Sequence, residues 1–179
     1  MQIFTSLFPL FLSSTLVFST PIAKRVDNTA KVLGDFSIIT RNVQHLSGNL
    51  ASFVKSPSIG IKTFSSHFSD LNDHLAVTTS DTVAVGSFNT MDSQSVANAA
   101  ATFAQDALTF LIALISDENA IAAAGQKSLV LGYLNTGNVA TLNLFTALEN
   151  SVNENELDTL SVAQEELQAA FTNSISAYS

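Results

Sequence analysis

The sequence contains no cysteine and no tryptophan, and the only proline after residue 25 is Pro57. Without cysteine the chain can form no disulfide, no zinc–thiolate site and no cysteine nucleophile, so a secreted domain of this sequence is held together by packing alone. A β-sandwich of similar size normally shows more turn residues between its strands. The scarcity of proline therefore favours long helices.

Basic residues are also scarce, with seven Lys and Arg against fifteen Asp and Glu. Beyond residue 25 only five basic residues remain, which gives that part of the chain a net charge of −10. A surface this acidic repels phosphates, so nucleic acid and anionic membrane surfaces are excluded as partners.

Residues 1–19 have the pattern of a signal peptide, with an apolar core over 3–18 and small residues at Val17 and Ser19 before the cleavage point. An apolar core of about 16 residues is too short for a transmembrane anchor. The Lys24-Arg25 pair resembles a kexin-type processing site, although two solvated charges ahead of a helix would look the same. We expect a secreted, extracellular protein with a signal peptide (1–19), a short pro-segment (20–25) and one mature domain (26–179).

Apolar residues recur at alternating spacings of three and four, which is the pattern of helices that bury one face in a bundle. The first helix has Asp27 or Asn28 as its expected N-cap and ends at Pro57, and the second ends by Gly86. Their apolar positions are Phe36, Ile39, Val43, Leu46, Leu50 and Phe53, followed by Ile61, Phe64, Phe68, Leu71, Leu75 and Thr78.

The stretch 93–116 is the longest apolar segment after the N-terminus, and Asp106 is its only charge. Only ten residues separate Asp106 from Asp117, which is ~15 Å of helix against a ~30 Å hydrocarbon core, so we do not expect a membrane span. A helix that is apolar on nearly every side must be covered by others. We therefore expect the central helix of a bundle here, capped by Asp92 or Ser93.

Two further helices are expected over 131–152 and 157–178, separated from the central helix by a loop around Gly125. Gly132 and Gly137 interrupt the first of the two at ~1 kcal/mol each relative to alanine. Short connections between helices of this spacing imply antiparallel neighbours and a left-handed supercoil. The expected fold class is an all-α, antiparallel bundle of about five long amphipathic helices in a single domain.

No constellation of residues supports catalysis or a cofactor. Ser52 and Lys55 have the spacing of a serine–lysine pair but lack its companion motifs, and no G-x-S-x-G sequence is present. His67, Asp70 and His74 share one helical face, which fits either a solvated flank of the seam or a weak metal or pH-sensing site. We expect no enzyme activity, no cofactor and no metal.

Nine phenylalanines follow residue 25, and most lie on helix seams beside alanine-rich faces. Ordinary core packing explains any one of them, but large residues beside small ones can leave an elongated apolar cavity between helices. The expected apolar wall comprises Phe64, Phe68, Leu71, Phe103, Ala107, Phe110, Leu111, Leu114, Leu142, Phe145, Leu167 and Phe171. With so few cations, a carboxylate would be held by hydroxyl or amide donors, for instance Tyr133, Thr102 or Thr109, or would stay near solvent at the tunnel mouth.

Several pieces of the chain, in this order, resemble the fungal hydrophobic surface-binding protein A family, also called the cell-wall galactomannoprotein family. They are TPIAKR, VDNTAKVLGDFSIITRNVQHLSGNLASF, the alanine-rich segment, KSLVLGYLNTGNVATLNLFTALENSV and the terminal FTNSISAYS. The resemblance implies a secreted, non-enzymatic, all-helical domain that adsorbs to hydrophobic surfaces and recruits hydrolases such as cutinase. It also implies fatty-acid binding inside the bundle in some members, and an association with the cell wall.

Two functions of different classes fit these observations. The first is a binding protein for apolar surfaces or ligands, above all a single long-chain fatty acid or a similar lipid. The second is a structural secreted or cell-wall protein whose bundle is solid. A continuous apolar tunnel beside Phe103, Ala107 and Phe110 would favour the first, and native packing density there would favour the second.

Overall fold

The computed structural model describes the backbone of residues 22–179 and the side chains of residues 28–179 other than Ser58. The predicted signal peptide and the first two residues of the predicted pro-segment lie outside the described residues. The elements in chain order are α1 (Ile22–Lys55), α2 (Pro57–Val85), α3 (Thr90–Ser116), α4 (Glu118–Ala123), α5 (Lys127–Glu149), a 3₁₀ turn η1 (Glu154–Glu156) and α6 (Leu157–Tyr178). All regular structure in this part of the chain is helical, which confirms the all-α fold class.

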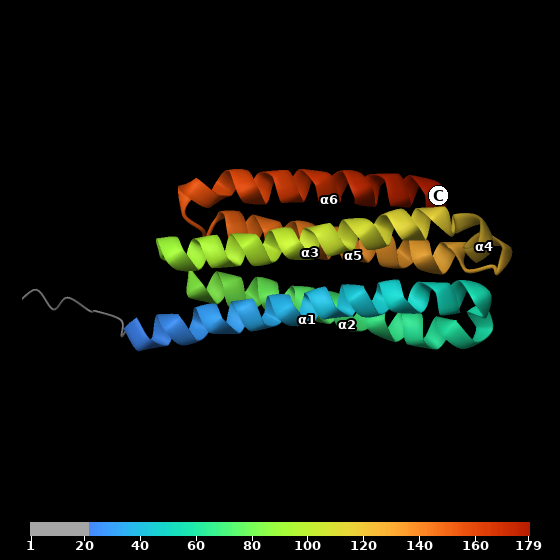
Figure 1. Ribbon diagram of the computed structural model, residues 1–179, viewed down its shortest axis with the longest axis horizontal. Helices are drawn as coiled ribbons and strands as arrows, with labels where there is room; N and C mark the ends of the chain where they lie inside the picture. The colour runs from blue at the N-terminus through green and yellow to red at the C-terminus, as the bar shows by residue number, and fades with distance from the viewer. Residues whose placement is uncertain (1–21) are drawn as a thin grey trace, which may run out of the picture.

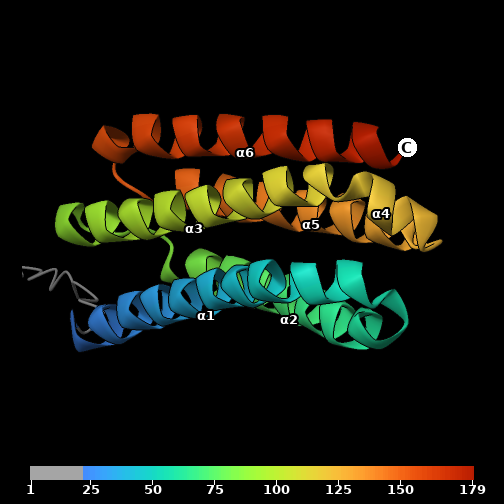
Figure 2. The ribbon, with the colours of Figure 1, turned by 45° about the vertical axis from the view of Figure 1, so that its right-hand side comes forward.

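The five long helices form a closed ring. The ring runs from α1 to α2, α5, α6 and α3 and back to α1, because each of these helices packs mainly against two of the others. Figures 1 and 2 show α1 and α2 at the base, α3 and α5 above them and α6 on top. The short helix α4 connects α3 to α5 at one end of the ring.

Helices that follow one another in the chain run in opposite directions, as the short connections predicted (Figure 1). The ring order nevertheless places parallel helices side by side. Helices α1 and α3, α3 and α6, and α2 and α5 are neighbours that run in the same direction. Only the α1–α2 and α5–α6 contacts join consecutive long helices, and each of these pairs is therefore a helical hairpin.

The core consists of the predicted apolar seams. Every apolar residue from Phe36 to Phe53 that was placed on the first seam is at most 3% exposed, and Phe64, Phe68, Leu71 and Leu75 of the second are at most 7% exposed. Alternating spacings of three and four keep successive apolar side chains on one face, and that face points into the ring. Burial of these faces holds the bundle together.

The helix ends differ from the prediction in several places. Helix α1 begins at Ile22, so Asp27 and Asn28 lie inside it and neither is its N-cap. The N-cap of α3 is Asn89, whose side chain accepts a hydrogen bond from the Asp92 backbone N–H, rather than Asp92 or Ser93. The segment expected to form a loop contains α4, and the chain turns only after it, at Gly125.

The hairpin of α1 and α2 is unusually tight because Ser56 alone separates the two helices. At Gly60 the backbones approach so closely that a Cβ atom would lie 2.6 Å from the Cα of Phe53. Only glycine is compatible with this approach. The other end of α2 is closed by Gly86, whose φ of 78° also favours glycine.

Helix α3 is a member of the ring and not a central helix enclosed by the others. Its buried residues include Phe103, Ala107 and Phe110, whereas Met91 is 80% exposed and Ile112 is 56% exposed. By length and composition α3 is the one described helix that could cross a membrane. Its apolar face is instead packed against α1 and α6 within the bundle.

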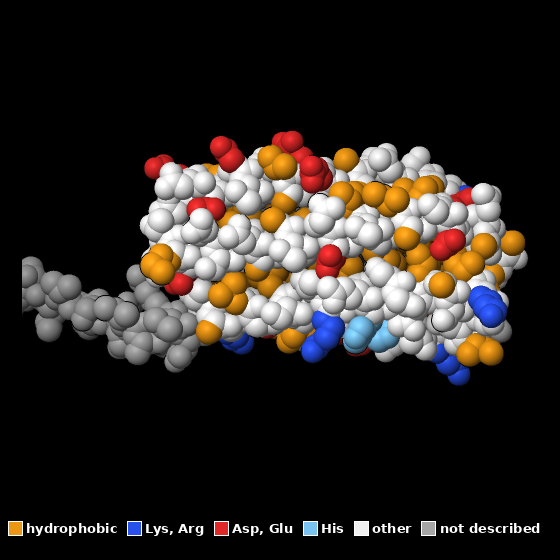
Figure 3. Space-filling model, viewed as in Figure 1, with side chains coloured by type: hydrophobic (Ala, Val, Ile, Leu, Met, Phe, Trp, Pro, Cys, Tyr) orange, Lys and Arg blue, Asp and Glu red, His pale blue; other side chains and the backbone are white. Residues whose placement is uncertain are grey.

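Charge is distributed unevenly around the ring. Lys31, Arg41, Lys55 and Lys62 all belong to α1 and α2, and blue side chains line the lower edge in Figure 3. Acidic residues gather on the opposite side, over η1 and α6. The α6 side of the bundle therefore repels anions, whereas the α1–α2 side carries most of the cations.

Candidate functional site

An enclosed apolar cavity lies on the axis of the ring, and all five long helices contribute to its wall. Its lining residues are Val43 from α1, Phe68, Leu71 and Leu75 from α2, Phe103, Ala107, Phe110 and Leu111 from α3, Gly137 and Thr141 from α5, and Phe171 from α6. A ring of five helices has no helix along its axis, so side chains alone fill that space. The cavity is the part of the axis that they leave unfilled.

The volume of the axial cavity is about 20 Å³. That is room for about one water molecule, whereas sites for small organic ligands span about 300–1,000 Å³. The structure therefore has no continuous tunnel beside Phe103, Ala107 and Phe110, the feature that would favour a ligand-binding protein. A long-chain ligand could occupy the axis only if the wall moved outward.

The structure gathers most of the predicted wall residues around the axial cavity. Those that line it are Phe68, Leu71, Phe103, Ala107, Phe110, Leu111 and Phe171. Phe64, Leu114, Phe145 and Leu167 are also buried but lie elsewhere in the core. Leu142 was wrongly expected to face the interior: it is 43% exposed, because its position on α5 points it outward.

An aromatic cluster lies beside the axial cavity. The rings of Phe53 and Phe64 are stacked with centroids 4.6 Å apart, and Phe64 and Phe68 both contact Phe110 at 6.3 and 5.9 Å. Offset and tilted pairs at these separations stabilise the core beyond their buried area. The cluster extends to α5, where Tyr133 stacks on Phe68 at 4.9 Å and 9°.

The predicted head-group residues do not lie together. Thr102 and Thr109 are exposed on α3, and each hydroxyl donates a hydrogen bond to the backbone carbonyl four residues earlier. Neither threonine lines the axial cavity, because both helical positions lie on the outer face of the ring. Tyr133 is half-buried and stacks on Phe68 at the contact between α2 and α5.

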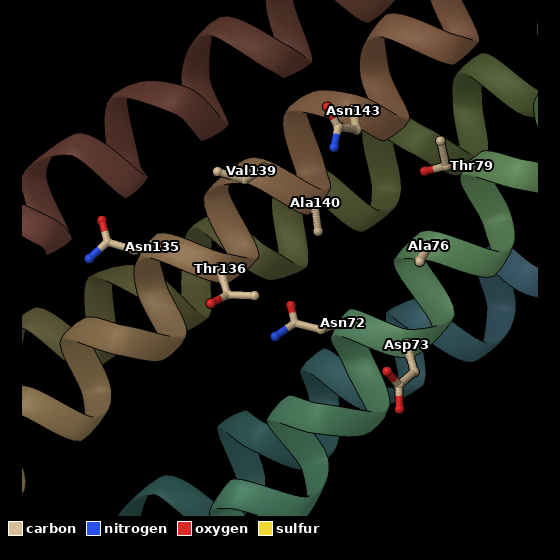
Figure 4. Close-up of a pocket in the computed structure, with 9 residues that line it drawn as sticks. All are labelled: Asn72, Asp73, Ala76, Thr79, Asn135, Thr136, Val139, Ala140 and Asn143. Atoms are coloured by element: carbon tan, nitrogen blue, oxygen red, sulfur yellow. The ribbon is translucent and has the colours of Figure 1, made fainter.

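A surface groove of about 670 Å³ follows the same α2–α5 contact (Figure 4). Asn72, Asp73, Ala76 and Thr79 line it from α2, and Asn135, Thr136, Val139, Ala140 and Asn143 line it from α5. Figure 4 shows the Asn72 side chain directed towards Thr136 and the Asp73 side chain directed away from α5. The groove thus combines an apolar floor with three amide side chains.

Only a thin wall separates this groove from the axial cavity. Gly137 lines the cavity, and a Cβ placed on it would lie 3.6 Å from Phe171 Cε1 and 3.7 Å from Asn72 Oδ1. Phe171 belongs to the cavity wall and Asn72 to the groove. At Gly137 the distance between the groove and the axial cavity is therefore about the size of one methyl group.

Prediction from the sequence missed Val43, Leu75, Gly137 and Thr141 as cavity residues and missed the whole groove. One signal was present, since a glycine in the middle of a helix usually has a packing or functional reason. Nothing in the spacing singled out Asn72, because polar residues that flank an apolar seam are ordinary in amphipathic helices.

Two carboxyl groups meet between α1 and α2. Burial raises the pKa of Asp35 to about 6, helped by a hydrogen bond with Asp81 and by the charge of Asp81, while Lys31 and His74 oppose the shift. Lys31 Nζ lies 2.7 Å from Asp81 Oδ1, and this hydrogen bond lowers the pKa of Asp81. Asp35 Oδ2 and Asp81 Oδ2 are buried without another hydrogen-bond partner in the described residues, as expected for carboxyls that share a proton.

The predicted histidine face lies along the contact between α1 and α2. The His67 ring contacts the His45 ring of α1 edge-on, with centroids 5.1 Å apart, and His74 lies near Asp35. Within residues 28–179 no group of three or more His, Asp and Glu side chains is arranged to hold a metal ion.

The sequence matches no protein-family model and no curated protein. Several solved structures have the same fold, among them those of three domains solved with fatty acids. AfMP4p in complex with palmitic acid is 26% identical, with a TM-score of 0.81 over 84% of this chain and 99% of that chain. Ligand-binding domain 1 of the Penicillium marneffei MP1 protein, complexed with arachidonic acids, is 11% identical, with a TM-score of 0.74 over 87% of this chain and 99% of the domain.

Ligand-binding domain 2 of the same MP1 protein, complexed with multiple arachidonic acids, is 13% identical, with a TM-score of 0.71 over 86% of this chain and 96% of the domain. At 11% and 13% identity, the two MP1 domains show only that this chain has their fold. The similarity is nonetheless to fungal proteins solved with fatty acids, which is consistent with a fungal mannoprotein-like family.

Proposed function

We propose that this chain is a secreted, non-enzymatic binding protein for one long-chain fatty acid, which it holds along the axis of the helical ring. The observation that carries the proposal is the fold, which is similar over 84% of the chain to a protein solved with palmitic acid and surrounds an axis lined by apolar side chains. The signal-peptide pattern of residues 1–19 supports secretion.

The energetics allow such a ligand. Helix α3 has 27 residues and is therefore ~40 Å long, enough for an extended chain of about sixteen carbons. Burying ~14 methylenes at ~0.8 kcal/mol each yields ~11 kcal/mol, against association and ordering costs of several kcal/mol. Outward movement of the wall adds to those costs, so we expect micromolar affinity.

The same apolar faces would serve adsorption to hydrophobic surfaces. If neighbouring helices part, the seams of α1 and α2 become available at ~25 cal/mol per Å² buried, and no disulfide prevents the movement. A secreted hydrolase delivered to such a surface is the partner that the family resemblance implies.

A structural protein with a solid bundle is the second candidate, and the small volume of the axial cavity favours it. A cavity of about 20 Å³ is as small as the voids that well-packed protein interiors normally contain. The two candidates differ in one measurable property, which is whether the folded protein takes up lipid.

Calorimetry with palmitate tests the proposal, together with native mass spectrometry for a co-purifying lipid. Ala107→Trp should abolish binding, because Ala107 lines the axial cavity and an indole there would occupy the axis. Phe110→Ala should instead change affinity in a chain-length-dependent way. Ala99→Trp is the matched control, since Ala99 lies two turns earlier on α3 and borders a surface groove next to α1.

If the parent protein does not bind palmitate, the proposed function is wrong and the structural role of a solid bundle remains. Undiminished binding by a correctly folded Ala107→Trp variant would show that the ligand does not lie on the axis.

A further inference from the structure

The α2–α5 contact is bordered by empty space on both sides. The groove residues Asn72 and Ala76 of α2 directly follow the cavity residues Leu71 and Leu75. On α5 the groove residues Thr136 and Ala140 directly precede the cavity residues Gly137 and Thr141. Outer groove and inner cavity therefore lie back to back across one contact between two helices.

This contact lacks the loop or the polar side-chain bonds that restrain the other contacts in the ring, and the stacked rings of Phe68 and Tyr133 bridge it. Helices α1 and α2 are joined by the tight turn at Ser56, and α5 and α6 by the short η1 segment. Hydrogen bonds from Gln44 to Asp106 and from Tyr178 to the Leu114 carbonyl connect α3 to α1 and to α6. Between α2 and α5 the described residues make no side-chain hydrogen bond or ion pair, and no loop joins these helices directly.

Small residues keep the contact thin. Ala76, Ala140 and Gly137 present at most a methyl group to the contact between α2 and α5. At Gly137 nothing but backbone stands between Phe171 and Asn72. A small separation of α2 from α5 would connect the groove with the axis here, without breaking a polar interaction between the helices.

The Asn72 amide supplies a recognition group at that point. Its Oδ1 is buried and has no hydrogen-bond partner among the described residues, so it is an acceptor that a ligand can satisfy. The oxygen can accept from a protonated carboxyl group, and a half-turn of the amide would present its NH₂ to a carboxylate. Because Oδ1 accepts no hydrogen bond in the described residues, this rotation of the Asn72 amide breaks no hydrogen bond at Oδ1.

We propose that the fatty acid enters the bundle between α2 and α5 beside Gly137, and that its carboxyl group stays in the groove on the Asn72 amide. The inference rests on the proposed function and identifies the entrance and the polar end of its site. Asp73 also borders the groove and repels an anion, but it is exposed and directed away from α5, so solvent screens its charge.

Stopped-flow fluorescence with cis-parinaric acid tests the entrance. Gly137→Val fills the thin wall, and Gly137→Ala fills it partly, at ordinary contact distances from Phe171 and Asn72. Gly132→Val is the matched control, because a Cβ on Gly132 of the same helix meets nothing within 4 Å. Gly137→Val should slow association by about tenfold or more, whereas Gly132→Val should associate at the rate of the parent.

Palmitate and hexadecanol, compared by calorimetry, test the polar end. Asn72→Leu should weaken palmitate about tenfold and leave hexadecanol nearly unchanged, because only the acid loses a charge-assisted hydrogen bond. Asn98→Leu, at an exposed position on α3, controls for the loss of an amide.

The outcomes separate this inference from the proposed function. A parent protein that binds neither probe overturns both. A parent that binds, with a folded Gly137→Val variant exchanging ligand at the parent's rate, overturns the entrance alone. Equal loss of palmitate and hexadecanol in Asn72→Leu overturns the assignment of the carboxyl group.

Discussion

Replacing Asp35 by asparagine should change how the stability of the protein depends on pH. The pKa of Asp35 is about 6 in the folded protein against an ordinary value of 3.8. Between these pH values the folded state binds more protons than the unfolded state, so the free energy of unfolding falls as the pH rises from ~4 to ~6. Asp35→Asn has no proton to lose, and its amide can still donate a hydrogen bond to Asp81.

The size of the effect follows from the shift. About two pH units at ~1.4 kcal/mol each set an upper limit of ~3 kcal/mol on the stability that the parent loses by pH 7, because solvent screening reduces the contribution. The variant should therefore match the parent near pH 4 and exceed its stability by up to ~3 kcal/mol above pH 7. The pKa of Asp81 is lowered by Lys31, so its own contribution is lost only as the pH falls below the ordinary carboxyl range, outside this window.

Urea unfolding at several pH values from 4 to 8 measures the difference directly. Asp70→Asn, which removes an exposed carboxyl from α2, is the control for net charge. A difference between Asp35→Asn and the parent that stays constant across the whole range would refute the reasoning.

Three further substitutions test the packing of the ring. Gly60→Ala should destabilise the protein by about 1–3 kcal/mol, because its Cβ would lie 2.6 Å from Phe53 Cα. Gly48→Ala, in open space on α1, should instead stabilise it by about 0.5–1 kcal/mol, and equal effects in thermal unfolding would contradict the close approach. Tyr178→Phe should cost about 1–3 kcal/mol in urea unfolding, because the Leu114 carbonyl loses a buried donor 2.7 Å away; an unchanged midpoint would mean that water replaces the hydroxyl.

The fold class could be predicted from the sequence because the helical period is a local property. Spacings of three and four from Phe36 to Phe53 fix which face of α1 is buried, whatever its neighbours are. Helix α6 has the predicted bounds, whereas α5 begins four residues and ends three residues before the predicted 131–152. The cap of α3 was missed because Asn89, Asp92 and Ser93 are all good capping residues, and only the backbone geometry decides among them.

The arrangement of the helices could not be predicted in the same way. An alanine-rich helix such as α3 fits the middle of a bundle or its wall equally well, and the exposed Ile112 shows that it belongs to the wall. The groove arises where α2 and α5 meet, although these helices are not consecutive in the chain. A contact of that kind depends on the order of the ring, which periodicity does not encode.

Because no helix lies on the axis of the ring, side chains alone determine how much space the interior offers to a ligand. In the described bundle the axis is filled only by groups projecting from the wall, among them Phe68, Phe103, Phe110 and Phe171. Shortening or lengthening one of them changes the interior volume while the hydrogen-bonded backbone of every helix stays as it is. Proteins that share this backbone can therefore differ in the size and number of the molecules they enclose, through a few substitutions at axial positions.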